Sequence, residues 1–150
     1  MKERNNPIKL IDVSSKEIVH REAEATGRIN LRGDTIEKIR AREIKKGDPL
    51  QTAEIACILA VKKTPDILPL CHPVPITSVD SAFKIADDHI EARCRVTADY
   101  KTGVEMEALT GVTVALLTIW DMVKYMEKDA DGQYPSTVIT DVKVTEKRKG

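Results

Sequence analysis

Aromatic residues are scarce in this sequence of 150 residues, which has one Phe, one Trp and three Tyr. Sheets that bind RNA by stacking bases on aromatic side chains are therefore not expected. The sequence also has no excess of one charge, because 24 Lys and Arg balance 24 Asp and Glu. Nucleic-acid-binding arms and cationic membrane-binding surfaces need such an excess, so we expect neither nucleic acid nor a membrane as a partner.

Long hydrophobic runs are also missing. The longest uncharged segments, residues 67–79 and 108–120, have thirteen residues each, whereas a transmembrane helix needs roughly 20 apolar residues. Residues 1–7 contain no apolar stretch of the kind found in secretory signals. We therefore expect a cytoplasmic protein.

Cysteine is infrequent, with three residues at positions 57, 71 and 94. Their number is odd and their spacing matches no zinc-binding pattern, so we expect free thiols in a reducing compartment. The sequence has neither a Walker phosphate-binding loop nor a dinucleotide-binding fingerprint, and its potential metal ligands are not clustered. We therefore predict no metal site.

The sequence does contain a regular succession of strand and helix patterns, which we interpret as one domain over residues 1–150. Apolar residues at every second position predict strands, and three- or four-residue spacing after capping residues such as Asp34 and Asp48 predicts helices. In chain order we predict a loose arm (1–11), a strand (19–32), two helices (34–46 and 48–64), a proline-rich loop without regular structure (65–75), a hairpin (77–85 and 90–98), a long helix (104–128), a last strand with Val138, Thr140, Val142 and Val144 on one face, and a short basic tail (147–150).

If the two consecutive helices are counted as one, this order is β-α-β-β-α-β, the ferredoxin-like pattern. It predicts an α+β fold with a four-stranded antiparallel sheet, helices on one face and an extra helix after strand 1. The long helix is apolar or small on all sides over residues 108–120. A single sheet cannot readily cover such a helix, so we predict an oligomer in which a second copy of the chain covers its other side.

Two charged residues near the end of the long helix are candidates for proton transfer. Asp121 and Lys124 are three residues apart and share a stripe with apolar flanks. One interpretation is an ordinary surface salt bridge, which contributes a few tenths of a kcal/mol. The other is a coupled acid–base pair in a cleft, whose pKa values depend on burial and on each other.

Further candidates lie in the loops and at the start of the long helix. His72 is in the proline-rich loop, where a rigid backbone can hold a histidine in a fixed position. We interpret the adjacent Cys71 as a packing residue rather than a nucleophile. Glu105 and Glu107 suit the dipole at a helix start, or they can approach a ligand. Lys46 is in a turn between helices, where exposure to solvent is the default interpretation and phosphate binding the alternative.

Arg21 lies on the small, apolar side of the first strand. An unpaired guanidinium is unfavourable there, so we predict that Arg21 meets an acidic residue such as Asp12 or a neighbour's Glu22, or a phosphate of the substrate. Together with the lysines and carboxylates above, it suits an anionic, phosphorylated substrate and proton transfer.

Several sequence strings resemble those of one known family. They are LPLCHP at 68–73, TGVEMEALT at 102–110 and LTIWDMVK at 117–124, together with DVS at 12–14 and KGD at 46–48. These strings are similar to those of the cyclic pyranopterin monophosphate synthases, the MoaC family of molybdenum-cofactor biosynthesis. The resemblance extends from about Ile11 to Lys147.

The resemblance implies a homohexamer, a trimer of dimers, with active sites at the dimer interface. It implies conversion of 3′,8-cyclo-7,8-dihydroguanosine 5′-triphosphate to cyclic pyranopterin monophosphate with release of pyrophosphate, by a phosphorus–oxygen lyase that needs no cofactor. Catalytic roles are expected for Asp121, Lys124 and Lys46. Substrate binding is expected for Asp12, Arg21, Leu70, Cys71, His72, Glu105, Met106, Glu107, Lys128 and Lys147.

Two departures from the family pattern concern the C-terminal end. The family continues with a glycine-rich tail after the position of Lys147, whereas this chain continues with Arg148, Lys149 and Gly150. Its turn over residues 130–136 is also longer. Two other functions remain open at this point: a ferredoxin-like module that binds a nucleotide without turnover, and a metal-dependent nucleotide hydrolase, although the metal ligands for the latter are not apparent.

Overall fold

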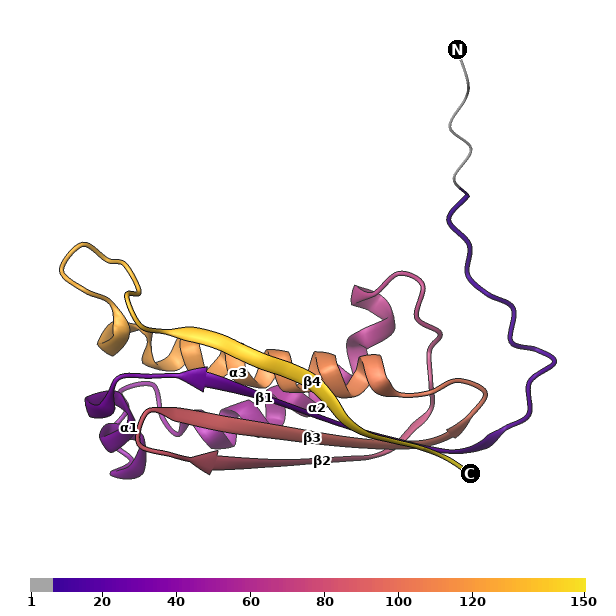
Figure 1. Ribbon diagram of the computed structural model, residues 1–150, viewed down its shortest axis with the longest axis horizontal. Helices are drawn as coiled ribbons and strands as arrows, with labels where there is room; N and C mark the ends of the chain where they lie inside the picture. Colours follow the sequence, from indigo (N-terminus) through magenta and orange to yellow (C-terminus); the bar gives the residue numbers. More distant parts are fainter. Residues whose placement is uncertain (1–6) are drawn as a thin grey trace, which may run out of the picture.

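Alternating apolar residues build four strands in this chain, which the computed structural model describes over residues 7–150 (Figure 1). The elements are β1 (Val19–Asn30), α1 (Gly33–Arg40), α2 (Pro49–Ile67), β2 (Ile76–Ile85), β3 (His89–Tyr100), α3 (Glu105–Glu127) and β4 (Val138–Lys149). The strands form one antiparallel sheet in the order β2-β3-β1-β4. This confirms the predicted ferredoxin-like fold. Residues 1–6 of the predicted arm lie outside the described residues.

Small residues on β1 allow α3 to pack closely against the sheet. Ala23, Ala25 and Gly27 point toward the helix layer, and both alanines are buried. A Cβ on Gly27 would lie 2.9 Å from Cδ1 of Leu116 on α3. The core is therefore the layer between the sheet and the helices α2 and α3.

α3 is covered on a second side, as the sequence predicts, but by α2 of the same chain. The two helices make extensive contact along their length, and Figure 1 shows both on one face of the sheet. α3 is long and apolar enough to span a membrane, yet half of the relevant window is buried in the fold. It is the core helix of the domain, and a partner is not needed for most of its cover.

Part of the helix layer nevertheless remains apolar and open to solvent. Leu117 on α3 is 52% exposed, and Ile55 and Leu59 on α2 are 59% and 53% exposed. Large apolar side chains gathered on one surface are typical of contacts between proteins. The contact with a second copy thus remains a prediction, and it applies to this outer surface.

α1 is shorter than the predicted helix over 34–46. It ends at Arg40, and the backbone turns at Arg42, whose φ is 58°. The Arg42 amide donates to the carbonyl of Ile39, and the Glu43 amide to that of Lys38, which closes the helix without a glycine. Gly47, the expected helix end, instead terminates a separate turn with a φ of 117°.

α2 extends beyond the predicted boundary. The sequence analysis ends this helix before Pro65, but the helix includes this proline and continues to Ile67. Proline lacks the amide that would bond the preceding turn, and the helix ends two residues after it. At its start the prediction is confirmed, because the Asp48 carboxylate accepts hydrogen bonds from the amides of Leu50 and Gln51.

β4 does not have the single apolar face that was predicted. Its pairing with β1 shifts register twice, between Thr26 and Arg28 and between Glu24 and Ala25. Each shift leaves one extra residue on β4, which is a β-bulge. The side chains toward the helices are therefore Ile139, Val142, Val144 and Lys147, whereas Val138 and Thr140 point to the open face. β4 also includes residues 147–149, which the sequence analysis assigns to a tail.

A buried carboxylate connects the end of α3 to two other segments. Glu127 is fully buried, and its oxygens accept hydrogen bonds from the amide of Arg32 at 3.1 Å and from the hydroxyl of Thr137 at 2.7 Å. The hydroxyl of Thr35 donates to the same carboxylate. Glu127 therefore joins the β1–α1 turn and the segment before β4 to α3.

We expect Gly111→Ala to destabilise the fold. A Cβ at Gly111 would lie 2.8 Å from Val61, 2.9 Å from the sulfur of Cys94 and 3.1 Å from that of Cys57, all of which are buried. Overpacking of this kind costs about 1–3 kcal/mol, more than the roughly 1 kcal/mol that alanine gains over glycine in a helix. Chemical denaturation should show a lower free energy of unfolding. Gly33→Ala is the control, because no atom lies within 4 Å of that position; equal stability of the two variants would contradict the expectation.

Candidate functional site

Three predicted catalytic residues form one cluster at the C-terminal half of α3. The ammonium of Lys124 lies 3.1 Å from the Asp121 carboxylate. The ammonium of Lys46 lies 3.6 Å from the same carboxylate and donates to the Asp121 carbonyl at 3.2 Å. A single carboxylate is thus flanked by two cations.

The turn that carries Lys46 is fixed against α3 by its neighbour. The amide of Lys45 donates to the Tyr125 hydroxyl at 3.1 Å, and the Lys45 ammonium lies 5.2 Å from the centre of the Tyr125 ring. The sequence analysis missed both residues. No local sequence pattern could have revealed this contact, because the two residues are 80 positions apart.

Both members of the Asp121–Lys124 pair are held in their charged forms. A hydrogen bond from Lys124, followed by the charges of Lys124 and Lys46, lowers the pKa of Asp121. The hydrogen bond to Asp121 raises the pKa of Lys124. Each of the two groups therefore stabilises the charged form of the other. The desolvation that would ease proton exchange is small in the single chain, where both side chains are exposed.

A second group of predicted residues lines a pocket at the other end of α3. This pocket, of about 150 Å³, lies between the proline-rich loop and the start of the helix. Its lining residues are Leu70, Cys71, His72, Val74, Thr102, Gly103, Met106 and Glu107. Five of the predicted substrate-binding residues are thus brought together.

The ionisable groups of this pocket have shifted pKa values. Burial raises the pKa of the Glu107 carboxyl, and the charge of Glu105 raises it further. Burial also raises the pKa of the Cys71 thiol, and the charge of Glu107 raises it further. A protonated thiol is a poor nucleophile, which supports the interpretation of Cys71 as a packing residue. Glu107 is therefore a carboxyl that keeps its proton to a higher pH than a solvated one does.

We expect Glu107→Gln to stabilise the fold at neutral pH but not at acidic pH. Because the pKa of Glu107 is raised above its usual 4.5, the folded state binds this proton more tightly than the unfolded state does. The protonated Glu107 carboxyl therefore contributes its full stabilisation below the usual pKa. This contribution is lost as the pH rises through the raised pKa. Melting temperatures of both proteins should coincide near pH 4 and diverge as the pH rises. A higher melting temperature of the wild type than of Glu107→Gln at neutral pH would contradict this expectation.

Lys147 and Arg21 lie on the same side of the sheet, close to the start of α3. The ammonium of Lys147 is 2.6 Å from the Glu105 carboxylate. Burial opposes ionisation of Glu105, but the hydrogen bond and charge of Lys147, with that of Arg21, lower its pKa. Arg21 is 6% exposed and donates to the carbonyls of Tyr100 and Lys101, at 3.5 and 3.1 Å. Within residues 7–150 the hydrogen-bond partners of Arg21 are these two carbonyls, so the predicted contact with Asp12 is not made, whereas the contacts with a neighbouring copy's Glu22 or with a substrate phosphate stay predictions.

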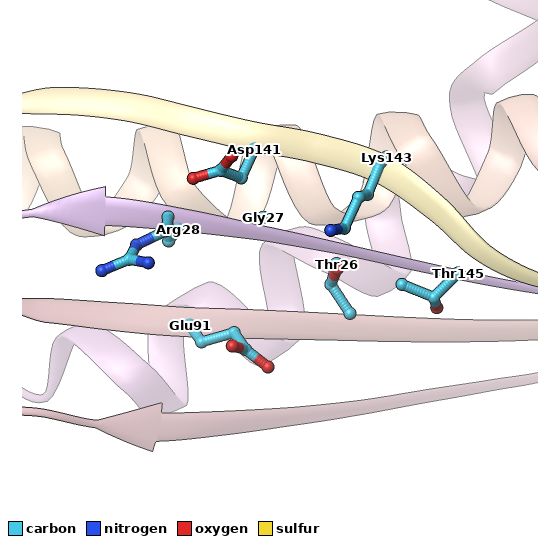
Figure 2. Close-up of a pocket in the computed structure, with 7 residues that line it drawn as sticks. All are labelled: Thr26, Gly27, Arg28, Glu91, Asp141, Lys143 and Thr145. Atoms are coloured by element: carbon cyan, nitrogen blue, oxygen red, sulfur yellow. The ribbon is translucent and has the colours of Figure 1, made fainter.

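The second bulge of β4 determines which way Lys147 points. Thr145 and Glu146 both lie on the open face, so Lys147 returns to the helix side, whereas strict alternation over residues 144–147 would direct Lys147 to the open face. Figure 2 shows Thr145 on that open face with Asp141 and Lys143, beside Thr26 of β1. The Thr145 hydroxyl contacts the carbonyl and the carboxylate of Glu24 there.

Deletion of both Thr145 and Glu146 should turn Lys147 away from Glu105, because Lys147 then follows the inward-pointing Val144 directly and neighbouring residues of a strand point to opposite faces. Because Lys147 lowers the pKa of the Glu105 carboxyl while burial raises it, the pKa of Glu105 should rise in the deletion variant. Titration of isotopically labelled glutamate carboxyls by NMR measures this. Thr145→Ala is the control, since it keeps the residue count and should leave the Glu105 titration unchanged. An unchanged titration after the double deletion would show that the number of residues between Val144 and Lys147 does not determine where Lys147 points.

The chain before β1 covers part of the His72 pocket. A neighbouring cavity of about 470 Å³ is lined by Leu10, Ile11, Asp12, Val13, Ser14, His72, Tyr100 and Lys101. His72 Nε2 lies 2.6 Å from the carbonyl of Ile11, and the Asp12 carboxylate accepts the amide of Ser14 at 2.9 Å. That hydrogen bond is the main cause of the lowered pKa of Asp12. Asp12 and His72, which are both expected to bind the substrate, therefore line one cavity.

The two groups of residues are far apart in one chain. Fourteen positions separate Glu107 from Asp121 on α3, which corresponds to about 21 Å at 1.5 Å per residue. Lys128 lies just after the end of α3, four positions beyond Lys124, and so belongs with Asp121 and Lys124. The structure thus divides the predicted site into a Lys46 cluster (Lys46, Asp121, Lys124 and Lys128) and a His72 cluster (His72, Glu107, Asp12, Arg21 and Lys147 with their neighbours).

The open face of the sheet has a hollow that contains none of these residues. It measures about 420 Å³ and lies over β1 and β4, where Arg28 and Lys143 face Glu91 and Asp141 (Figure 2). The two positive charges there are matched by two negative ones. Within residues 7–150, no group of three or more His, Cys, Asp or Glu side chains is arranged to hold a metal ion.

The sequence of the whole chain is similar to that of known proteins. Residues 10–150 match the MoaC family. The chain is 61% identical over 143 residues to the probable cyclic pyranopterin monophosphate synthase of Thermococcus kodakarensis, covering 95% of this chain and 92% of that protein. It is 62% identical to the corresponding Pyrococcus abyssi protein, covering 95% and 89%. A Methanothermobacter thermautotrophicus protein named as a probable accessory protein of this synthase is 58% identical, covering 95% and 89%.

Proposed function

The chain belongs to the MoaC family, and we propose that it converts 3′,8-cyclo-7,8-dihydroguanosine 5′-triphosphate to cyclic pyranopterin monophosphate, an early step of molybdenum-cofactor biosynthesis. The observation that carries this proposal is the similarity over nearly the whole length to synthases of that name. The reaction releases pyrophosphate, so the protein acts as a phosphorus–oxygen lyase. We further propose that it works in the cytoplasm, without a cofactor.

The chemistry of the two clusters supports this reaction. Its substrate carries a triphosphate, which needs cations, and its rearrangement needs groups that remove and deliver protons. The Lys46 cluster supplies two ammonium groups around Asp121. The His72 cluster supplies a histidine and the buried Glu107 carboxyl with its raised pKa. We assign acid–base roles to Asp121 and Lys124, a supporting role to Lys46, and substrate orientation to the His72 cluster.

The separation of the clusters supports an active site shared between two chains. One substrate molecule must meet both clusters, which lie about 21 Å apart along α3. A two-fold axis brings the Lys46 cluster of one copy to the His72 cluster of another, and it creates two such sites per pair. The exposed apolar residues Ile55, Leu59 and Leu117 on the helix layer support an interface there. We propose a homohexamer built as a trimer of such dimers.

Mixing two inactive variants tests the shared site. Lys46→Ala damages one cluster and His72→Ala the other. In a randomly mixed dimer, each hybrid has one site with both lesions and one intact site, so equal co-expression should restore about a quarter of wild-type activity. The matched control is Lys46→Ala with Lys124→Ala, which damage the same cluster and should not complement. No recovery in the first mixture would mean that each site is built by one chain.

A nucleotide-binding module without turnover is the alternative function. The relative named as an accessory protein makes the distinction worth testing directly. The protein is incubated with the cyclised nucleotide, and both pyrophosphate and the pterin product are measured. We expect both products in equal amounts. Tight binding without pyrophosphate release would support the binding module instead.

A further inference from the structure

The cavity between the N-terminal arm and the His72 loop contains a lysine that the predicted site does not include. Lys101 lines this cavity together with His72 and Asp12. Its ammonium donates one hydrogen bond, to the carbonyl of Ser14 at 3.3 Å. Within residues 7–150, no carboxylate oxygen lies within 4.0 Å of this ammonium. Because an ammonium has three N–H donors, Lys101 retains donors for a ligand in the cavity.

The other two cations of the His72 cluster already have partners. The ammonium of Lys147 is paired with the Glu105 carboxylate at 2.6 Å. The guanidinium of Arg21 is buried and donates to two backbone carbonyls. A phosphate that enters the cavity must therefore compete with the Glu105 carboxylate for Lys147, whereas within residues 7–150 no carboxylate competes for Lys101.

The position of Lys101 is also fixed before any ligand binds. Its own carbonyl accepts a hydrogen bond from Arg21 at 3.1 Å, which holds the backbone at the end of β3. Its ammonium is held against the arm by Ser14. A preorganised charge loses little conformational freedom on binding. Arg21 thus acts here as a positioning residue for the segment that carries Lys101.

We propose that Lys101 binds a phosphate oxygen of the nucleotide triphosphate substrate. This inference rests on the proposed function and adds a substrate-binding residue to it. Charge-assisted hydrogen bonds between an ammonium and a phosphate are about twice as strong as neutral ones. The substrate then lies with its phosphates beneath the arm, beside Asp12 and His72, and its remaining part reaches toward the pocket of Glu107.

Two constants test this assignment: the inhibition constant of pyrophosphate and the KM of the substrate. In Lys101→Met, both constants should rise by roughly 10–100-fold, the loss expected for one charged hydrogen bond. Lys101→Arg should stay within a few-fold of the wild type, because it keeps the charge. Lys16→Met is the matched control: it removes an exposed lysine from the same N-terminal region and should leave both constants unchanged.

The outcomes separate this proposal from the proposed function. Turnover by the wild type tests the function, whereas the ratio between variants tests Lys101. Wild-type constants in Lys101→Met would overturn the assignment while the function stands. Equal losses in Lys101→Met and Lys101→Arg would also overturn it, because they would show that the shape of the side chain matters rather than its charge.

Discussion

Lys46→Ala, Asp121→Asn and Lys124→Ala are each expected to lower turnover by about 10²–10⁴-fold, the usual effect of removing a positioned acid–base group. Their stability should remain that of the wild type. The three side chains form ion pairs that are exposed to solvent, and such pairs contribute about 0–1 kcal/mol to folding. Single-turnover kinetics and thermal melts of the same samples provide both measurements.

An exposed ion pair elsewhere on the chain provides the control for this prediction. Lys38 and Glu43 lie 3.0 Å apart, with exposure similar to that of Lys124 and Asp121. Lys38→Ala and Glu43→Gln should retain both activity and stability. Near-normal turnover in Asp121→Asn and Lys124→Ala would identify their contact as an ordinary helix salt bridge and would place the proton transfers elsewhere.

Glu127→Ala is expected to lower the free energy of unfolding by about 3–5 kcal/mol. The substitution leaves the Arg32 amide and the hydroxyls of Thr35 and Thr137 without their acceptor, and each buried donor without a partner costs about 1–3 kcal/mol. Domains of this kind have a total stability of only about 5–15 kcal/mol. Denaturant unfolding should therefore show a large shift of the midpoint.

Two further variants show whether the buried contacts cause this loss. Glu127→Gln keeps the size of the side chain but offers one acceptor oxygen, so it should be intermediate. Glu54→Ala removes an exposed glutamate from α2 and should change stability by no more than about 0.5 kcal/mol. If Glu127→Ala unfolds at the same denaturant concentration as Glu54→Ala, the carboxylate does not join the three segments as its contacts indicate.

The sequence was sufficient to predict the order of the elements, because the buried faces alternate regularly. β1 and β3 show this clearly, with every second residue buried over most of their length. Helix ends were harder to predict. α1 ends through a positive φ at Arg42, where no glycine marks the turn, and α2 tolerates Pro65 within its last turn. The bulges of β4 depend on its partner strand, so its own sequence does not reveal them.

The candidate site was predictable in its residues but not in its arrangement. The pairing of Asp121 with Lys124 follows from helical spacing, and the structure confirms it. The contact between Lys46 and Asp121 joins residues 75 positions apart, which spacing cannot reveal. The two backbone carbonyls that accept hydrogen bonds from Arg21 were not predicted, because they lie 79 and 80 positions away in the sequence. Lys101 was missed because nothing in its local sequence distinguishes it from a surface lysine.

The two bulges also affect how this protein avoids aggregation. β4 is an edge strand of the sheet, and a long, flat edge offers unpaired amides and carbonyls to strands of other molecules. Bulges at Asp141 and Thr145, with lysines at 143, 147 and 149, interrupt that edge with twist and charge. A variant with a straightened β4 would therefore be expected to form edge-to-edge assemblies during refolding. The same backbone irregularity that directs Lys147 toward Glu105 thus also helps to keep the protein dispersed.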